Sequence, residues 1–135
     1  MTVVVPSCRP VVEPDADSGW WWSAFEEGRL LCPHCNACGS TFFPPMPTCP
    51  QCGKGDIEPI EVSGRGTIYS WVVVHIALDP AFAGDVPYTI LAVELEEGAR
   101  LFGRLVGAGE AVAGGAVRIA PYRANGKLLP GFEFA

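Results

Sequence analysis

The sequence predicts a mainly β protein, in which a short helix and a metal-binding ribbon precede a small barrel. Three observations lead to this prediction. Cysteines recur at short repeated spacings between residues 32 and 52, β-branched runs separated by glycine fill the second half, and an aromatic segment near residue 20 has helical spacing. We therefore expect an extended tail over residues 1–16, a helix and ribbon over residues 17–58, and a barrel over residues 59–135.

Composition and charge limit the functions open to this chain. Its 135 residues are 49% hydrophobic, enough for a packed core, and carry a formal charge of −6. Negative charge opposes binding to phosphate backbones, so nucleic acid is not an expected partner. The apolar runs are far shorter than the ~20 residues of a membrane-spanning helix. Because the first residues lack the pattern of a signal peptide, we expect a cytoplasmic location.

The first 28 residues predict a tail followed by one helix. Three prolines in the first 16 residues exclude a continuous helix there. Asp17 or Ser18 can act as the N-cap of a helix, and Gly28 suits the left-handed position just after its end. Trp21 and Phe25 lie four residues apart and share one face of this helix. We expect that face to pack on the chain's own ribbon or barrel, with contact to another subunit as the alternative.

Two loops of the same form, Cys-x-x-Cys-Gly, predict a metal site. The first contains Cys35 and Cys38, the second contains Cys49 and Cys52, and ten residues separate Cys38 from Cys49. Two residues between cysteines let a tight turn direct both sulfurs at one ion, and two such turns complete a tetrahedron. A shell of four thiolates has no position for a catalytic water, so we expect a structural Zn²⁺.

Three alternatives to this zinc site remain open from the sequence. Cys32 forms a further Cys-x-x-Cys spacing with Cys35, beside His34, although the following glycine favours the pair of Cys35 and Cys38. Iron is compatible with the same four sulfurs, as in rubredoxin, and would permit electron transfer. Disulfides are the third alternative, but paired spacing without a secretion signal favours a metal, which leaves Cys8 and Cys32 as free thiols.

The second half of the chain predicts five or six short antiparallel strands. The candidate strands cover residues 66–78, 88–96, 100–106, 116–122 and 128–134. Glycine-containing turns separate them, and Asn125-Gly126 is the strongest hairpin signal. A sheet this small has exposed edges unless it closes, so we expect a five-stranded barrel of the OB type.

The sequence shows no catalytic constellation. His34 and His75 are the only histidines, and His75 follows an apolar run in an expected strand, where a hydrogen-bonded structural role is the simpler interpretation. The chain lacks a nucleophile elbow, a phosphate-binding loop, a dinucleotide-binding glycine motif and the common metalloenzyme motifs. We therefore predict no catalytic residue and no independent enzyme activity.

Residues 98–132 reverse the overall charge balance. This segment contains one acid, Glu110, and five basic residues: Arg100, Arg104, Arg118, Arg123 and Lys127. We treat these five as weak candidates for binding an anion such as the phosphates of CoA, with an ordinary solvated surface as the simpler interpretation of each. A second hypothesis follows from the fold class, because OB barrels often stack the bases of single-stranded nucleic acid on aromatic side chains.

From about residue 18 to its end, the chain resembles a family of rubredoxin-like zinc-ribbon plus OB-fold proteins, long catalogued as a domain of unknown function. The matching segments are the aromatic helix ending at Glu27-Gly28, the two cysteine loops, Phe43-Pro44-Pro45, residues 63–70, Pro87-Tyr88, residues 93–95 and residues 103–107. This ordered series covers both expected modules.

The resemblance implies a function that the residues alone do not. Members of this family act as non-catalytic accessory or scaffold subunits of acyl-CoA-processing complexes. The implied partner is a thiolase-like aldolase or acyltransferase of steroid or lipid side-chain metabolism, or an acyl-CoA hydratase. A CoA thioester is the implied small-molecule ligand, which the partner and this chain would share.

Overall fold

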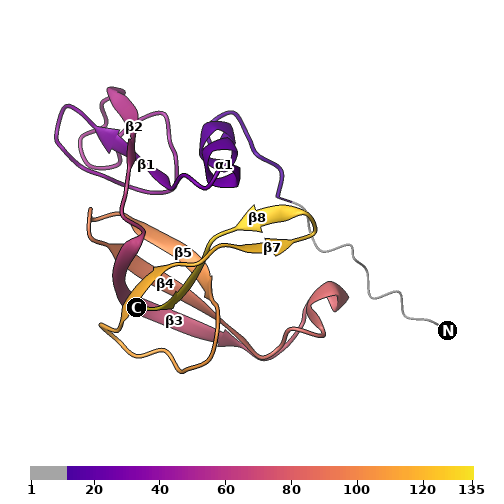
Figure 1. Ribbon diagram of the computed structural model, residues 1–135. Helices are drawn as coiled ribbons and strands as arrows, with labels where there is room; N and C mark the ends of the chain where they lie inside the picture. Colours follow the sequence, from indigo (N-terminus) through magenta and orange to yellow (C-terminus); the bar gives the residue numbers. More distant parts are fainter. Residues whose placement is uncertain (1–11) are drawn as a thin grey trace.

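The computed structural model describes residues 12–135, and these form a ribbon module at one end of a closed barrel (Figure 1). The ribbon module contains α1 (Gly19–Glu26), β1 (Leu31–Cys35) and β2 (Ile57–Glu61). The barrel strands are β3 (Arg65–Val74), β4 (Tyr88–Leu95), β5 (Arg100–Leu105), β6 (Ala116–Ile119) and β9 (Gly131–Phe134). Between them lie a short 3-10 helix, η1 (Pro80–Phe82), and a hairpin of β7 (Tyr122–Ala124) and β8 (Lys127–Leu129). Most of the expected tail, including Cys8, lies outside the described residues.

Helix α1 begins and ends where the sequence predicts. Ser18 is its N-cap residue, but the carboxylate of Asp15 holds the preceding turn by accepting hydrogen bonds from the backbone N–H groups of Asp17 and Ser18, at 3.1 and 2.8 Å. Gly28 follows the helix with a φ of 83°, a conformation that glycine adopts without strain. Among residues 12–135, no helix combines the length and the apolar character needed to cross a membrane.

The aromatic face of α1 packs on the chain itself. Trp21 and Phe25 are 1% and 2% exposed, and their rings stack at 4.9 Å. The indole Nε1 of Trp21 donates a 2.7 Å hydrogen bond to the Leu31 carbonyl, which fixes the helix against β1. Both rings belong to the same buried cluster as barrel residues such as Leu91 and Phe132. The helix therefore contributes to one core that continues into the barrel.

The barrel closes in the order β3-β4-β5-β9-β6, with β5 and β9 parallel and every other pair antiparallel. Cross-strand pairing aligns Ile68, Val93 and Leu101 on its inner face. Phe132, fully buried, joins them from β9. Closure gives every barrel strand two neighbours in the sheet. The prediction of a five-stranded OB-type barrel is confirmed.

Three predicted strands differ from the structure by more than one residue at an end. The strand predicted over residues 66–78 ends at Val74, because its partner β4 begins opposite, at Tyr88. The strand predicted over residues 116–122 is interrupted beside Pro121, and the one predicted over residues 128–134 is interrupted at Pro130. Proline has no backbone N–H to donate to a ladder, and the chain leaves the barrel at Pro121 and rejoins it after Pro130.

The excursion between Pro121 and Pro130 is the β7–β8 hairpin. Its turn is Asn125-Gly126, with φ values of 52° and 76°, as the sequence predicts for a two-residue hairpin turn. The hairpin forms a separate two-stranded sheet that lies beneath α1 (Figure 1).

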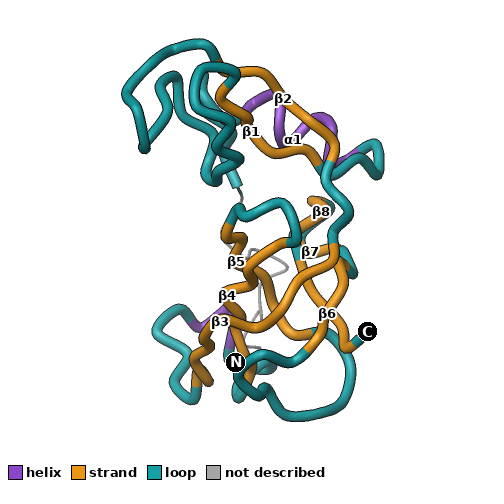
Figure 2. The backbone as a smooth tube through the Cα atoms, turned by 90° about the vertical axis from the view of Figure 1, so that its left-hand side faces the viewer, coloured by secondary structure: helices purple, strands orange, loops and turns teal. Residues whose placement is uncertain are grey.

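The ribbon joins the barrel through a short connection. Strand β2 pairs with β1 along its full length, from Leu31↔Glu61 to Cys35↔Ile57. Residues 62–64 then lead directly into β3, and the chain passes from the ribbon to the barrel on one side (Figure 2). The expected module boundary between residues 58 and 59 lies inside β2. We therefore propose it as a division of the sequence and not as the end of a structural element.

Candidate metal centre and the barrel surface

The structure brings the four predicted cysteines together. The sulfurs of Cys35, Cys38, Cys49 and Cys52 all lie within 4.8 Å of one another, and the Cys35–Cys52 and Cys38–Cys49 pairs are 3.6 Å apart. Zn–S bonds of ~2.3 Å in a tetrahedron place the sulfurs about 3.8 Å apart. A disulfide would need a separation of about 2.05 Å. The four cysteines are therefore positioned for metal binding and not for disulfide formation.

Backbone geometry of the two loops explains their shared sequence. Gly39 and Gly53 have φ values of 78° and 76°, and each donates a 2.8 Å hydrogen bond back to the carbonyl of the first cysteine of its loop. Burial acts to raise the pKa of the Cys49 thiol, but hydrogen bonds from the backbone of Cys52 and Gln51 outweigh it and lower this pKa to about 7. The loop amides thus stabilise the thiolate, which is the form that binds a metal.

Cys32 and His34 lie outside this cluster. Cys32 is fully buried in the core cluster shared by α1 and the barrel, where burial, aided by the charge of Glu97, raises the pKa of its thiol to about 12. The Nδ1 atom of His34 is hydrogen-bonded to the Thr41 hydroxyl at 2.8 Å. Because β1 alternates its side chains, Cys32 and Cys35 fall on opposite faces of the strand. The geometry favours Cys35 over Cys32 as a ligand.

The basic candidates do not form one anion-binding patch. Four of them contact a carboxylate: Arg100 with Glu94 at 3.7 Å, Arg104 with Asp85 at 2.8 Å, Arg118 with Glu133 at 3.2 Å, and Arg123 with Glu26. Lys127 lies over the Trp22 ring, 5.5 Å from its centroid. The acidic partners come from outside residues 98–132, so counting charge within that segment could not reveal them. These contacts favour a structural role for most of the basic candidates.

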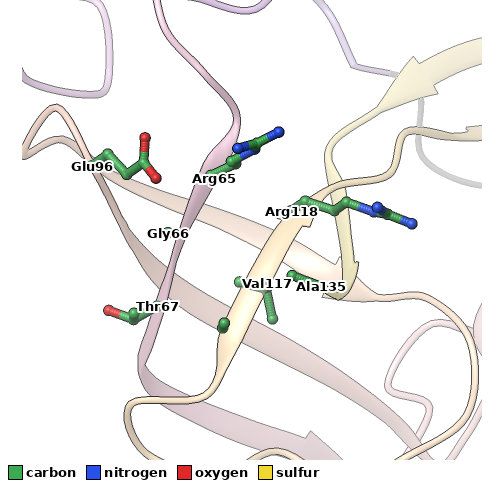
Figure 3. Close-up of a pocket in the computed structure, with 8 residues that line it drawn as sticks. Arg65, Gly66, Thr67, Glu96, Val117, Arg118 and Ala135 are labelled. Carbon is green, nitrogen blue, oxygen red and sulfur yellow. The ribbon is translucent and has the colours of Figure 1, made fainter.

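One cavity lies beside the pairing of β3 with β6. It measures about 440 Å³, and the side chains of Arg65 and Arg118 extend to the same side of the two strands there (Figure 3). Both arginines are exposed, and Glu96 and Glu133 lie near them. The charges in this cavity are therefore mixed and solvated, which does not favour tight anion binding.

Neither histidine lines the cavity beside β3 and β6. His34 lies in β1 with its hydrogen bond to Thr41, and His75 is exposed immediately after β3, beyond the end of the strand in which the sequence placed it. The ion pair of Arg104 and Asp85 could not be predicted from the sequence. Its acid lies in the loop between β3 and β4, and no spacing rule links that loop to β5.

Comparison with known proteins decides the family. The rubredoxin-like zinc ribbon domain of ChsH2 matches residues 22–58, and the C-terminal OB-fold domain of ChsH2 matches residues 59–120. A solved structure named Ltp2-ChsH2(DUF35) aldolase contains a chain that is 36% identical, with a TM-score of 0.79 over 93% of this chain and 98% of that one. The chain belongs to the ChsH2 family of DUF35 proteins.

Several other proteins are similar to this chain over part of their length. A probable enoyl-CoA hydratase alpha subunit of Thermomonospora curvata is 40% identical over 73% of this chain and 30% of its own length. A DUF35 domain-containing scaffold protein of Methanocaldococcus jannaschii is 40% identical over 64% of this chain and 61% of its own length. The benzoylsuccinyl-CoA thiolase subunit BbsA of Thauera aromatica is 35% identical over 55% and 49%. The chain thus spans less than two thirds of each of these relatives.

Proposed function

We propose that this chain is a non-catalytic accessory subunit that scaffolds an acyl-CoA-processing enzyme. The partner in this proposal is a thiolase-like aldolase or acyltransferase acting on steroid or lipid side chains, or an acyl-CoA hydratase. One observation carries the proposal: the match to the DUF35 chain of an aldolase extends over 93% of this chain and 98% of that one. The names of the relatives, which include a scaffold, a hydratase subunit and a thiolase subunit, point to the same class of assembly.

The metal centre supports a scaffolding role. We infer that Cys35, Cys38, Cys49 and Cys52 hold a structural Zn²⁺, whose four thiolate ligands complete its coordination. An ion bound in this way has no open position for substrate or water, so its contribution is to fix the loops and not to perform chemistry. We place the protein in the cytoplasm, where thiols stay reduced and available to the metal.

Native mass spectrometry of the protein purified from its own host, with metal analysis of the same sample, tests this proposal. We expect one zinc per chain and a thiolase-like or hydratase-like partner subunit. A chain that arrives alone, or that carries iron or nucleic acid, would overturn the proposed function.

A pair of cysteine variants controls this experiment. Cys49→Ser removes a proposed ligand, whereas Cys32→Ser changes a cysteine outside the cluster. We expect Cys49→Ser to lose both zinc and partner and Cys32→Ser to retain both. Retention of zinc by Cys49→Ser would contradict the ligand assignment without affecting the choice of partner.

A further inference from the structure

A second cavity, of about 240 Å³, lies on the barrel beside the Arg104–Asp85 ion pair. Its walls come from three segments that are distant in sequence: the loop between β3 and β4, the paired strands β4 and β5, and the β7–β8 hairpin. The side chains that line it include Phe82, Tyr88, Ile90, Arg104, Tyr122 and Leu129. All of them are partly exposed and so remain accessible to a ligand.

Strand alternation places this cavity on the outer face of the barrel. Leu91 and Val93 are fully buried and point into the core, so Ile90 on the same strand points outward. Ile90 pairs across the ladder with Arg104, which therefore shares the outer face. In OB barrels, ligands bind on the second and third strands, between the loop that joins strands one and two and the loop that joins strands four and five. Here those positions correspond to β4, β5, the η1 loop and the β7–β8 hairpin.

The cavity presents flat aromatic surfaces without a net charge. The rings of Phe82 and Tyr88 lie 6.2 Å apart, and the guanidinium of Arg104 lies 4.6 Å from the Tyr88 centroid and 5.9 Å from that of Tyr122. Asp85 neutralises Arg104, and the two side chains are only 15% and 21% exposed. Because this ion pair is largely shielded from solvent, its side chains form a fixed wall of the cavity. Arg104 is consequently a poor candidate for a phosphate contact, but its planar group can pack against a ring.

The size of the cavity limits what it can hold. Pockets that enclose a whole drug-sized ligand measure roughly 300–1,000 Å³. A cavity of about 240 Å³ holds the equivalent of roughly eight water molecules. It can therefore take one ring system of a larger molecule, with the remainder of that molecule lying outside.

We propose that this cavity binds the adenine ring of a CoA thioester, an inference that rests on the proposed function above. The aromatic faces and the guanidinium plane suit a flat π-system. One N–H of Arg104 donates to Asp85, and a guanidinium has five such donors, so the others can donate to ring nitrogens of adenine. A saturated acyl chain offers neither a flat face nor an acceptor. The single enclosed ring site also differs from the basic groove with successive stacking platforms that a nucleic acid strand requires.

Calorimetric titration of the purified protein, with any partner that it retains, tests this inference with three probes. These probes are CoA, 4′-phosphopantetheine, which lacks the adenosine, and a 12-nucleotide oligo(dA). We expect CoA to bind, 4′-phosphopantetheine to bind at least tenfold more weakly than CoA, and oligo(dA) to bind no more tightly than CoA. Equal binding of CoA and 4′-phosphopantetheine overturns the inference, and so does tighter binding of oligo(dA) than of CoA.

Four variants locate the binding. Tyr122→Ala removes one wall and should weaken CoA binding by about 5- to 100-fold, whereas Tyr122→Phe keeps the ring and should stay within about twofold. Tyr69→Ala is the matched control, because Tyr69 is an exposed tyrosine that packs on Arg100, away from the cavity. Phe82→Ala changes a wall residue from the loop between β3 and β4 and is measured beside Tyr122→Ala, so that the test holds if one of the two variants loses its fold.

The outcomes separate this inference from the proposed function. If a partner co-purifies but CoA binding is unchanged in both wall variants, the adenine site is wrong and the accessory role stands. If Tyr122→Ala lowers CoA affinity in a chain that retains no partner, the adenine site stands and the accessory role is wrong. Equal losses in Tyr69→Ala and Tyr122→Ala assign CoA to another surface and overturn the inference.

Discussion

Different interactions stabilise the ribbon and the barrel. Around the metal loops, the buried apolar cluster consists of Cys35, Phe42 and Cys49, with Met46 and Ile57 packed against it. The barrel cluster contains large aliphatic and aromatic side chains that are fully buried, together with the face of α1. Apolar burial contributes ~25 cal/mol per Å², so we expect the core that α1 shares with the barrel to be stable without the ion and the loops to depend on it.

Metal removal should give the largest difference between the two regions. Structural zinc sites contribute an apparent ~10–16 kcal/mol at neutral pH, so chelation or Cys49→Ser should unfold the loops over residues 36–56. The barrel should persist because its core lies outside the sulfur cluster. Amide hydrogen exchange by NMR measures both effects in one sample. We expect the loop amides to lose protection while those of β3, β4 and β5 keep it.

The control for this prediction is Cys32→Ala, which truncates a buried cysteine of the other cluster. It should retain the metal and lower stability by about 1 kcal/mol through the small space that it leaves. Simultaneous loss of ribbon and barrel protection on chelation would show instead that the two regions fold as one unit.

A core truncation in the barrel should instead destabilise the barrel. Phe132 is 0% exposed, so Phe132→Ala should lower the free energy of unfolding by about 3–5 kcal/mol. Phe102→Ala makes the same chemical change on a side chain that is 65% exposed, and its effect should stay within about 0.5 kcal/mol. Urea titration followed by circular dichroism measures both variants. Similar losses in the two variants would contradict the assignment of Phe132 to the core.

Overpacking at Gly103 should cause a smaller loss of stability than the truncation of Phe132. A Cβ atom there would lie 2.8 Å from two ring carbons of Phe132, so Gly103→Ala should cost about 1–3 kcal/mol. Gly84 has nothing within 4 Å of the same atom and is outside the left-handed region, so Gly84→Ala should be nearly neutral. Thermal melts of both variants, with zinc bound, compare them. A neutral Gly103→Ala would show that the Phe132 ring can shift.

Sequence patterns predicted the parts of this molecule that local chemistry determines. The two Cys-x-x-Cys-Gly loops set their own geometry through positive-φ glycines, and Asn125-Gly126 forms its hairpin turn. The aromatic helix was predictable for the same reason, since the four-residue spacing of Trp21 and Phe25 defines a buried face.

Features that depend on contacts between distant segments were not predictable. Pro121 and Pro130 break two expected strands. The sequence does not show that the chain leaves the barrel after β6 and returns to it as β9, which pairs with β5. The basic candidates looked like one patch until their acidic partners appeared from other parts of the chain. In particular, Glu26 lies in α1, 97 residues before the Arg123 that it contacts.

The contact between Glu26 and Arg123 lies at the junction of the two regions, and its loss gives the smallest predicted effect on stability. Glu26 accepts hydrogen bonds from the Arg123 side chain and from the Leu128 backbone N–H, and these hold its pKa below the ordinary value of 4.5. A carboxyl whose pKa is lowered by folding stabilises the fold above its unfolded pKa, and this contribution is lost as the pH falls through the folded value. The β7–β8 hairpin should therefore loosen from α1 below about pH 4.5.

The Leu128 amide proton reports this change directly, because its charge-assisted hydrogen bond to Glu26 weakens when the carboxylate is protonated. Its exchange rate, corrected for the intrinsic effect of pH, should rise in acid. In Glu26→Gln the amide should exchange faster already at neutral pH and show no further acid dependence. Glu27→Gln changes the neighbouring carboxylate and should leave the Leu128 profile unaltered. An identical pH profile in the wild-type chain and in Glu26→Gln would show that the junction depends on packing of Trp22 against Lys127 and not on this carboxylate.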